Sequence, residues 1–265
     1  MKHLNTYITE YIVKKKLDKP IDSENHYEYF PKTKEKLVKN IKELIEKGIY
    51  NFNCIDTSEI TDMSYLFDNF EYMDIKENFN VSDWNVSNVE DMQYMFYNCE
   101  KFNCDLSDWN VSNVKDMQCM FNSCKSFEGK GLEKWDVSNV EDMSYMFSHC
   151  ENFKGVSIEK WNVSNITTME NMFFNCKTLN CDFSSWNVHN VINMSSMFER
   201  CIKFEGKGLE KWDVSNAINM KYMFYDCKKF EGKGLENWNV SNVKYMKKMF
   251  NGYTSIKNKP SWYKE

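Results

Sequence analysis

Residues 106–127 read LSDWNVSNVKDMQCMFNSCKSF, and this pattern recurs through most of the chain. Most copies set Trp, Val, Asn and Val ahead of a Met, a Met-Phe pair, Cys and Phe at fixed offsets. The tryptophans lie 25, 26, 26, 25, 26 and 26 residues apart. They are Trp84, Trp109, Trp135, Trp161, Trp186, Trp212 and Trp238. A fixed period of this size indicates a repeat protein built from small stacked units.

Each unit divides into two halves. Leu106, Trp109 and Val111 are apolar, with a polar residue between the last two, which is typical of a short, half-buried strand. From Val114 to Cys124 the apolar residues are spaced by three, three, one and three, which predicts one face of a short helix. We therefore predict an α/β repeat solenoid, a leucine-rich-repeat-like, right-handed stack of strand-plus-helix units with an N-terminal helical cap.

Stacking such units places like residues in columns. A unit this small cannot bury its apolar face alone, so we expect Trp, Val, Met, Phe and Cys columns to form one dry core. An Asn precedes the position of the second Val in all seven copies, and we interpret its amide as a partner for backbone groups left free where the strand ends. The alternative is a polar stripe that faces a ligand. These residues are Asn88, Asn113, Asn139, Asn165, Asn190, Asn216 and Asn242.

The repeat begins before the first Trp. The stretch Ile55–Phe67 has the same pattern with Ile55 at the Trp position, and an insertion at residues 68–80 follows it. We expect about eight units over residues 51–265, with an atypical last unit that includes Trp262 and caps the core.

Residues 1–50 do not follow the repeat. A helix is predicted at residues 34–47, where apolar residues share one face, Thr33 precedes as a cap and Gly48 follows as a terminator. We expect this helix to cover the open end of the stack. An earlier amphipathic helix at residues 4–12 either docks on the cap or serves partner binding or self-association.

The string WDVSNVEDMSYMF at residues 135–147 resembles the BspA-like leucine-rich repeat proteins. The same repeat domain is described in mycoplasma lipoproteins of unknown function. The resemblance covers about residues 50 to 255. It implies a leucine-rich-repeat-like solenoid; members of that family are described as surface proteins with adhesive roles, and similar arrays are common in gut bacteria and their phages. The resemblance brings no catalytic residues.

The charge distribution and the absence of a visible targeting signal argue against nucleic-acid binding and membrane insertion. The net charge is −5; residues 1–50 carry 11 Lys against 8 Asp plus Glu, so the remainder carries −8. An acidic array argues against nucleic-acid binding, which needs a basic face. No signal peptide, lipobox or membrane-spanning run is visible, so we predict no membrane insertion. We expect folding in the cytoplasm; a cell-surface or phage-particle location without a visible signal is the alternative.

Six of the ten cysteines occupy one place, 15 residues after each Trp. That place lies on the predicted apolar face, so we expect a column of reduced, buried thiols, which fits a cytoplasmic site of folding. Disulfides between neighbouring units are the alternative. No Cys-x-x-Cys spacing occurs, and we predict no metal and no cofactor.

The functional hypothesis is a noncatalytic module that binds a protein partner through its strand face. The four histidines form no nucleophile, metal or triad pattern, so we expect no enzyme. An adhesive surface protein or a phage-particle component is the alternative. The residues before and after each Trp are the candidates: Asp83, Asn85, Asp108, Asn110, Lys134, Asp136, Lys160, Asn162, Lys211 and Asp213. A second candidate is the outer helix face, with Tyr94, Tyr97, Tyr145, Tyr222 and Tyr225.

Overall fold

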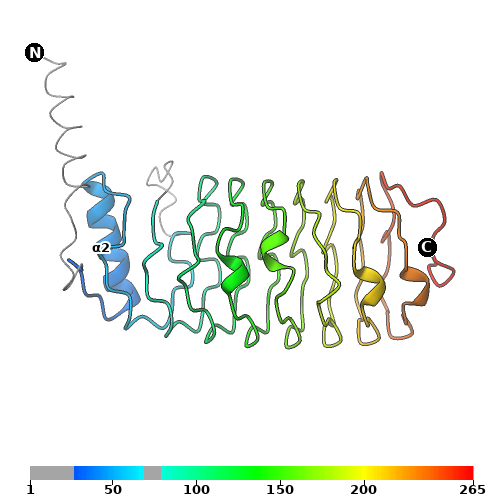
Figure 1. The fold of residues 1–265 in the computed structure, drawn as a ribbon, viewed down its shortest axis with the longest axis horizontal. Helices are drawn as coiled ribbons and strands as arrows, with labels where there is room; N and C mark the ends of the chain where they lie inside the picture. Colours follow the sequence, from blue (N-terminus) through cyan, green and yellow to red (C-terminus); the bar gives the residue numbers. More distant parts are fainter. Residues whose placement is uncertain (1–26, 69–78, 265) are drawn as a thin grey trace, which may run out of the picture.

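The computed structural model describes residues 27–68 and 79–264. The chain runs through successive circuits that lie side by side along the long axis of the molecule (Figure 1). We call one circuit of about 25 residues a rung. Neighbouring rungs are joined by isolated parallel bridges between equivalent residues. One column of bridges passes through Asp62, Asp91, Asp116, Asp142, Thr168, Asn193, Asn219 and Tyr245.

Helix α2 (Lys34–Glu46) lies at the N-terminal end of the row of rungs, where a helix is predicted (Figure 1). Thr33 caps it, because its side chain accepts the Lys36 N–H at 3.4 Å. Leu37, Ile41 and Leu44 are buried and join the core of the rungs. Helix α2 therefore shields the first apolar rung from water. The helix predicted at residues 4–12 lies outside the described residues.

The predicted strand at Leu106–Val111 and the predicted helix at Val114–Cys124 are wrong. Residues 79–264 contain four short 3-10 helices and no α-helix: η2 (Leu132–Lys134), η3 (Val156–Ile158), η4 (Leu209–Lys211) and η5 (Leu235–Asn237). The helix cannot form because Cys119 and Ser123 have φ of 55° and 64°. A residue in the left-handed region ends a right-handed helix.

Hydrogen bonds between rungs take the place of helical bonds in this segment. The N–H groups of Met117, Cys119 and Phe121 donate to carbonyl oxygens of the next rung at 3.1, 2.9 and 2.9 Å. The Met120 N–H instead donates to the Met117 carbonyl, closing a local turn at 3.2 Å. Alternate N–H groups therefore face the C-terminal neighbour, and those between them close turns within the rung.

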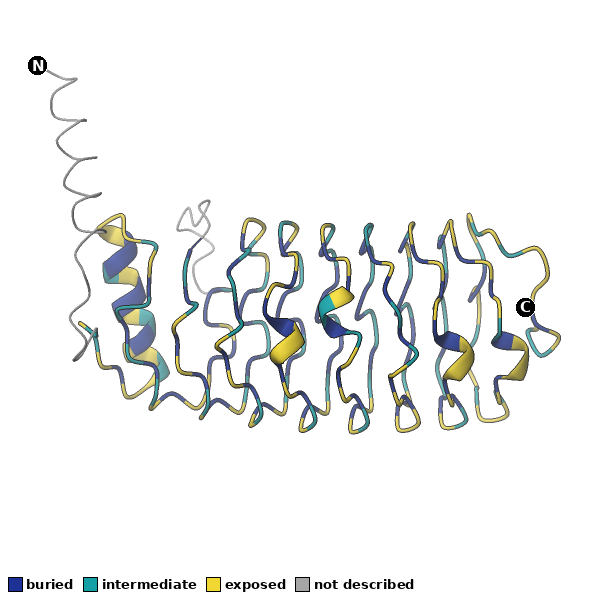
Figure 2. Ribbon diagram, viewed as in Figure 1, coloured by how far each residue is buried: buried dark blue, intermediate teal, exposed yellow. Residues whose placement is uncertain are grey.

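The core is built from columns of buried side chains. Figure 2 shows that buried residues recur in every rung. The Trp135 and Trp161 rings stack at 6.3 Å with an interplanar angle of 2°. Phenylalanines stack from Phe96 to Phe250 at 5.4 to 5.8 Å between successive rungs. Trp262 extends the Trp column, since its ring lies 6.3 Å from that of Trp238. The core thus runs from α2 to Trp262.

Indole nitrogens anchor each rung to the one before it. Trp161 Nε1 donates to the Leu132 carbonyl at 2.8 Å, and the other six repeat tryptophans make the same bond to the preceding rung at 2.9 to 3.1 Å. Trp262 bonds the Leu235 carbonyl in the same way at 2.9 Å. The Trp column therefore carries hydrogen bonds as well as buried area, and a buried indole N–H needs such a partner.

The alternation of 25 and 26 residues has a structural cause. The 26-residue spacings that end at Trp135, Trp161, Trp212 and Trp238 each include a 3-10 helix just before the Trp. The 25-residue spacings that end at Trp109 and Trp186 have no such helix among the described residues. The extra residue is therefore accommodated on one side of the rung and leaves the columns aligned.

All ten cysteines lie in the described part of the chain, and all are free thiols. The Sγ atoms of Cys150 and Cys176 donate to Phe121 and Phe147 carbonyls of the preceding rung at 3.0 and 2.9 Å. Cys99 differs, since it is only partly buried and its Sγ lies 3.8 Å from the Tyr97 carbonyl. Burial raises the pKa of the Cys150 thiol, which keeps it protonated and able to donate.

Candidate interaction surfaces

The residues on either side of each Trp form an exposed surface, which we call the Trp-flanking face. All ten candidates are exposed, on the rungs of Trp84, Trp109, Trp135, Trp161 and Trp212. They are Asp83, Asn85, Asp108, Asn110, Lys134, Asp136, Lys160, Asn162, Lys211 and Asp213. The face is not a strand, because Lys134 and Lys211 lie in η2 and η4. Since each Trp between them is buried, its neighbours point to solvent in two columns.

The residues that directly follow the Trp residues also form hydrogen bonds within their own rung, a structural role that the sequence analysis did not predict. Asn85, Asp136 and Asp213 each accept the N–H of the Ser two residues later, at 3.1, 3.0 and 3.0 Å. Hydrogen bonds from Ser138 lower the pKa of Asp136, because they favour its charged form. Such Asx turns shape the corner of the rung. One side-chain oxygen of each residue is thus already engaged.

The lysines before the Trp residues are different. Lys134, Lys160 and Lys211 are exposed and make no ion pair with any residue of the described ranges. Elsewhere on the rungs lysines do pair with the preceding rung. Lys130 Nζ lies 2.6 Å from Asp105, and this pair lowers the pKa of Asp105 to about 2. The Trp-flanking lysines thus differ from these paired lysines in having no anionic partner among the described residues.

The Asn column joins neighbouring rungs. Asn139 Nδ2 donates to the Ser112 carbonyl of the preceding rung at 2.7 Å, and the other six amides make the equivalent bond at 2.6 to 2.9 Å. Each amide therefore satisfies a backbone carbonyl at the corner. The members are Asn88, Asn113, Asn139, Asn165, Asn190, Asn216 and Asn242.

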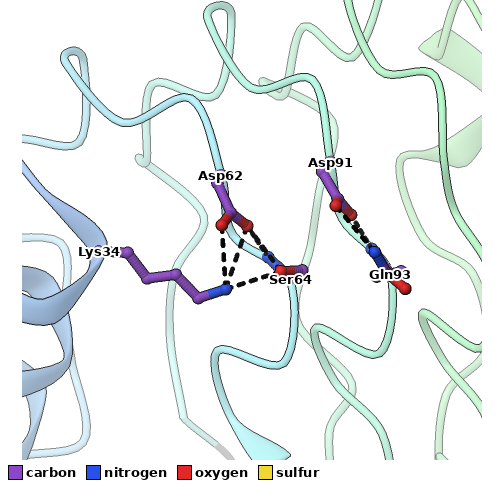
Figure 3. Close-up of polar contacts among 5 residues, drawn as sticks. All are labelled: Lys34, Asp62, Ser64, Asp91 and Gln93. Atoms are coloured by element: carbon purple, nitrogen blue, oxygen red, sulfur yellow. Dashed lines mark hydrogen bonds and ion pairs between the residues drawn. The ribbon is translucent and has the colours of Figure 1, made fainter.

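A second column of acceptors lies beside the bridges. In seven rungs the side chain of the residue before the first Met accepts the backbone N–H two residues later. Asp62 accepts the Ser64 N–H at 2.8 Å and Asp91 the Gln93 N–H at 2.9 Å (Figure 3). Lys34 Nζ of α2 lies 3.1 Å from Asp62 Oδ1 and 2.7 Å from Ser64 Oγ (Figure 3). Burial opposes ionisation of Asp62, but hydrogen bonds from Ser64 and Lys34 outweigh it and lower its pKa. The cap helix is thereby tied to the first rung.

The tyrosines predicted on an outer helix face lie instead on the turn segment. All five, Tyr94, Tyr97, Tyr145, Tyr222 and Tyr225, are partly buried. The Tyr94 ring stacks on that of Tyr65 at 4.6 Å with an angle of 7°. Tyr94, Tyr145 and Tyr222 have φ of 55°, 59° and 56°, which a bulky residue seldom adopts. These rings offer flat apolar contact area.

A shallow groove of about 390 Å³ runs beside the Asn column on three middle rungs. Its lining combines carboxamides with Thr167, Ile192 and Ile218. Ile192 is 45% exposed, which makes it an apolar surface residue that no pattern in the sequence signalled. The groove has no ionisable lining residue and so offers shape and hydrogen bonds rather than acid–base chemistry.

Residues 27–68 and 79–264 contain no group of three or more His, Cys, Asp or Glu placed to hold a metal ion. His189 Nδ1 lies 2.8 Å from Asp213 Oδ2, and His189 Nε2 lies 3.1 Å from Asn216 Nδ2. Both ring nitrogens of this exposed histidine are thus engaged in joining two rungs. No helix in the same ranges is long and apolar enough to cross a membrane.

The family described as "Mycoplasma protein of unknown function, DUF285" matches residues 34–157 and again residues 146–263. The chain belongs to this family. The two matches together span α2 and the rungs, so the DUF285 domain occurs here as a repeated domain. The function of DUF285 proteins is unknown, so the family assigns no role to any residue. No curated protein and no solved structure gives a significant match to this chain.

Proposed function

We propose that this DUF285 protein is a noncatalytic interaction module that binds a protein partner through the Trp-flanking face. The observation that supports it is the pair Lys134 and Lys160. Both are exposed, they occupy the same place on adjoining rungs, and neither has an ion pair among the described residues. Partner recognition by an elongated exposed surface is the usual role of stacked repeats.

The charge pattern of the face suggests what the partner presents. Adjoining rungs are about 4.8 Å apart, so Lys134 and Lys160 repel each other while no anion lies between them. Acidic side chains of a partner would relieve this repulsion. The preceding rungs carry Asp83 and Asp108 at the same place, so basic groups fit there. A partner with this reciprocal pattern would bind in one orientation, because the reversed orientation sets like charges against each other.

We also propose that the rungs form a leucine-rich-repeat-like solenoid. The Phe column, which stacks without a break from Phe96 to Phe250, and the rung-to-rung amide bonds support this architecture. Such a solenoid would hold the lysines of the Trp-flanking face at regular spacing. Rigid spacing lowers the entropy that binding must otherwise overcome.

The test compares three immobilised proteins in quantitative affinity proteomics of the source material. They are the wild type, the variant Lys134→Glu/Lys160→Glu/Lys211→Glu, and the control Lys101→Glu/Lys203→Glu/Lys229→Glu. The control lysines are also exposed and lie in a different column, so the change in net charge is the same. We expect a partner that the wild type and the control capture and the face variant loses. If all three capture the same proteins, the Trp-flanking face is not the binding surface.

A further inference from the structure

The last rung lacks an acceptor that every earlier rung has. In the seven preceding rungs of the bridge column, an Asp, Thr or Asn accepts the N–H two residues later. Asn219, for example, accepts the Lys221 N–H at 3.2 Å. Tyr245 takes this place in the last rung, and its side chain cannot reach back as a short acceptor does. The Lys247 N–H therefore has no acceptor among the described residues.

The N–H groups on either side of Lys247 are also without acceptors in the described ranges. Their equivalents one rung earlier, Met220 and Tyr222, donate to carbonyls at 2.7 and 3.1 Å. Met246 and Lys248 make no such bond. Three successive N–H groups, at Met246, Lys247 and Lys248, thus have no acceptor within residues 27–68 and 79–264. Lys248 has φ of 58°, and successive N–H groups around a left-handed residue form a concave anion-binding nest.

The surroundings of these N–H groups are positively charged. Lys244, Lys247 and Lys248 are exposed and form no ion pair with residues 27–68 or 79–264. Residues 239–264 contain six Lys and no Asp or Glu, although the array as a whole is acidic. The Asp226 carboxylate, at the far corner of the rung, already accepts the Tyr253 N–H at 2.8 Å. Unpaired N–H groups and lysines together favour a bound carboxylate.

We propose that the nest at Met246, Lys247 and Lys248, with the Lys244, Lys247 and Lys248 side chains, binds carboxylates of an acidic polypeptide segment. A polypeptide fits because further backbone N–H groups without an acceptor in the described ranges follow at alternate residues, which is the spacing at which an extended peptide presents its carbonyl groups. Phe250 and Gly252 are the next alternate donors, and neither has an acceptor among the described residues. In the preceding rung the equivalent N–H groups of Phe224 and Asp226 donate to the carbonyls of Met249 and Asn251, two residues apart, at 3.0 and 3.1 Å. This site is separate from the Trp-flanking face and does not depend on it.

The test uses a fluorescein-labelled heptaglutamate peptide and fluorescence anisotropy with the full chain. Tyr245→Asn restores the internal acceptor for the Lys247 N–H without changing the charge. Loss of a hydrogen bond to a charged group corresponds to about tenfold weaker binding. We expect that loss from Tyr245→Asn, together with an equal or higher melting temperature. Lys247→Gln/Lys248→Gln should weaken binding at least as much, and it should lower the salt dependence.

The matched control is Lys101→Gln/Lys203→Gln, which removes the same charge from a different column and should bind as the wild type does. The Lys134→Glu/Lys160→Glu/Lys211→Glu variant should also bind normally, which separates this site from the Trp-flanking face. Unchanged binding in Tyr245→Asn would overturn the role of the nest. Equal or tighter binding of a single-stranded oligothymidylate of the same charge would overturn the assignment to a polypeptide.

Discussion

Replacing Gly131 by alanine tests how tightly the rungs are packed. Gly131 has φ of 93°, and a Cβ there would lie 2.2 Å from the Ser107 nitrogen and 2.6 Å from the Leu106 carbonyl carbon. These are backbone atoms of the preceding rung, so no side chain can rotate to make room. The neighbouring rungs would have to separate by roughly 1 Å to restore an ordinary contact.

That separation breaks the bonds that hold the two rungs together at this point. The Leu106 N–H donates to the Lys130 carbonyl and Trp135 Nε1 to the Leu106 carbonyl, both at 3.1 Å. Losing both costs about 2 kcal/mol, since each is worth about 1 kcal/mol net. The left-handed φ adds about 1 kcal/mol for alanine. With overpacking strain of about 1–3 kcal/mol added, we expect Gly131→Ala to destabilise the protein by about 4–6 kcal/mol.

Gly48→Ala is the matched control. Gly48 also has a left-handed φ, of 72°, but a Cβ there meets nothing within 4 Å. We expect a loss of only about 1 kcal/mol from the conformation itself. Urea unfolding, followed by tryptophan fluorescence and circular dichroism, gives the two midpoints. Equal shifts of the two midpoints would refute the reasoning, because the close approach between rungs would then carry no energy.

Three further outcomes are expected. Trp161→Phe keeps a ring but removes the indole N–H from the Leu132 carbonyl, which then accepts only the Trp135 N–H at 3.2 Å. With the smaller ring, this should cost about 1–3 kcal/mol in urea unfolding, and Trp161→Ala about 3–5 kcal/mol. Smaller losses would mean that the Trp column does not carry the core. A thiol-reactive dye should label the partly buried Cys54 in the native protein and spare the five fully buried thiols of the Cys column, whose pKa burial raises. These five are Cys124, Cys150, Cys176, Cys201 and Cys227. Fast labelling of any of them would contradict the packing. An NMR titration should place the pKa of Asp105 at about 2, and Lys130→Met should return that pKa toward 3.8. Because the pKa of Asp105 is lower in the folded state, the ion pair stabilises the fold above about pH 4, and this stabilisation is lost as the pH falls toward 2. A pKa of Asp105 that Lys130→Met leaves unchanged would rule out the ion pair as its cause.

The candidate surfaces were only partly readable from the sequence. The residues after Trp135 and Trp212 are exposed because the buried Trp has extended backbone, which sends the next side chain outward. Lys134 and Lys211 are instead exposed at the ends of short 3-10 helices. The engagement of Asn85 and Asp136 in Asx turns was not foreseen, although Asn-x-Ser and Asp-x-Ser are common turn signals. The nest in the last rung has a trace in the sequence, namely Tyr245 where earlier units have Asp, Thr or Asn. The substitution of Tyr245 can be interpreted only when the structure shows that the equivalent Asp, Thr or Asn side chains accept a backbone N–H.

The sequence by itself determined the period, the buried columns and the position of the cap helix. Each follows from local information: the tryptophan spacing, the apolar residues at fixed offsets, and the amphipathic run after Thr33. The conformation of each rung was decided by tertiary structure. Apolar spacings of three, three, one and three suit a helix, and they suit equally a pair of turns joined by a left-handed residue such as Cys119. The N–H groups of Met117 and Phe121 are bonded to the next rung. Those bonds exist only when the rungs are stacked, so no pattern within one unit could reveal them.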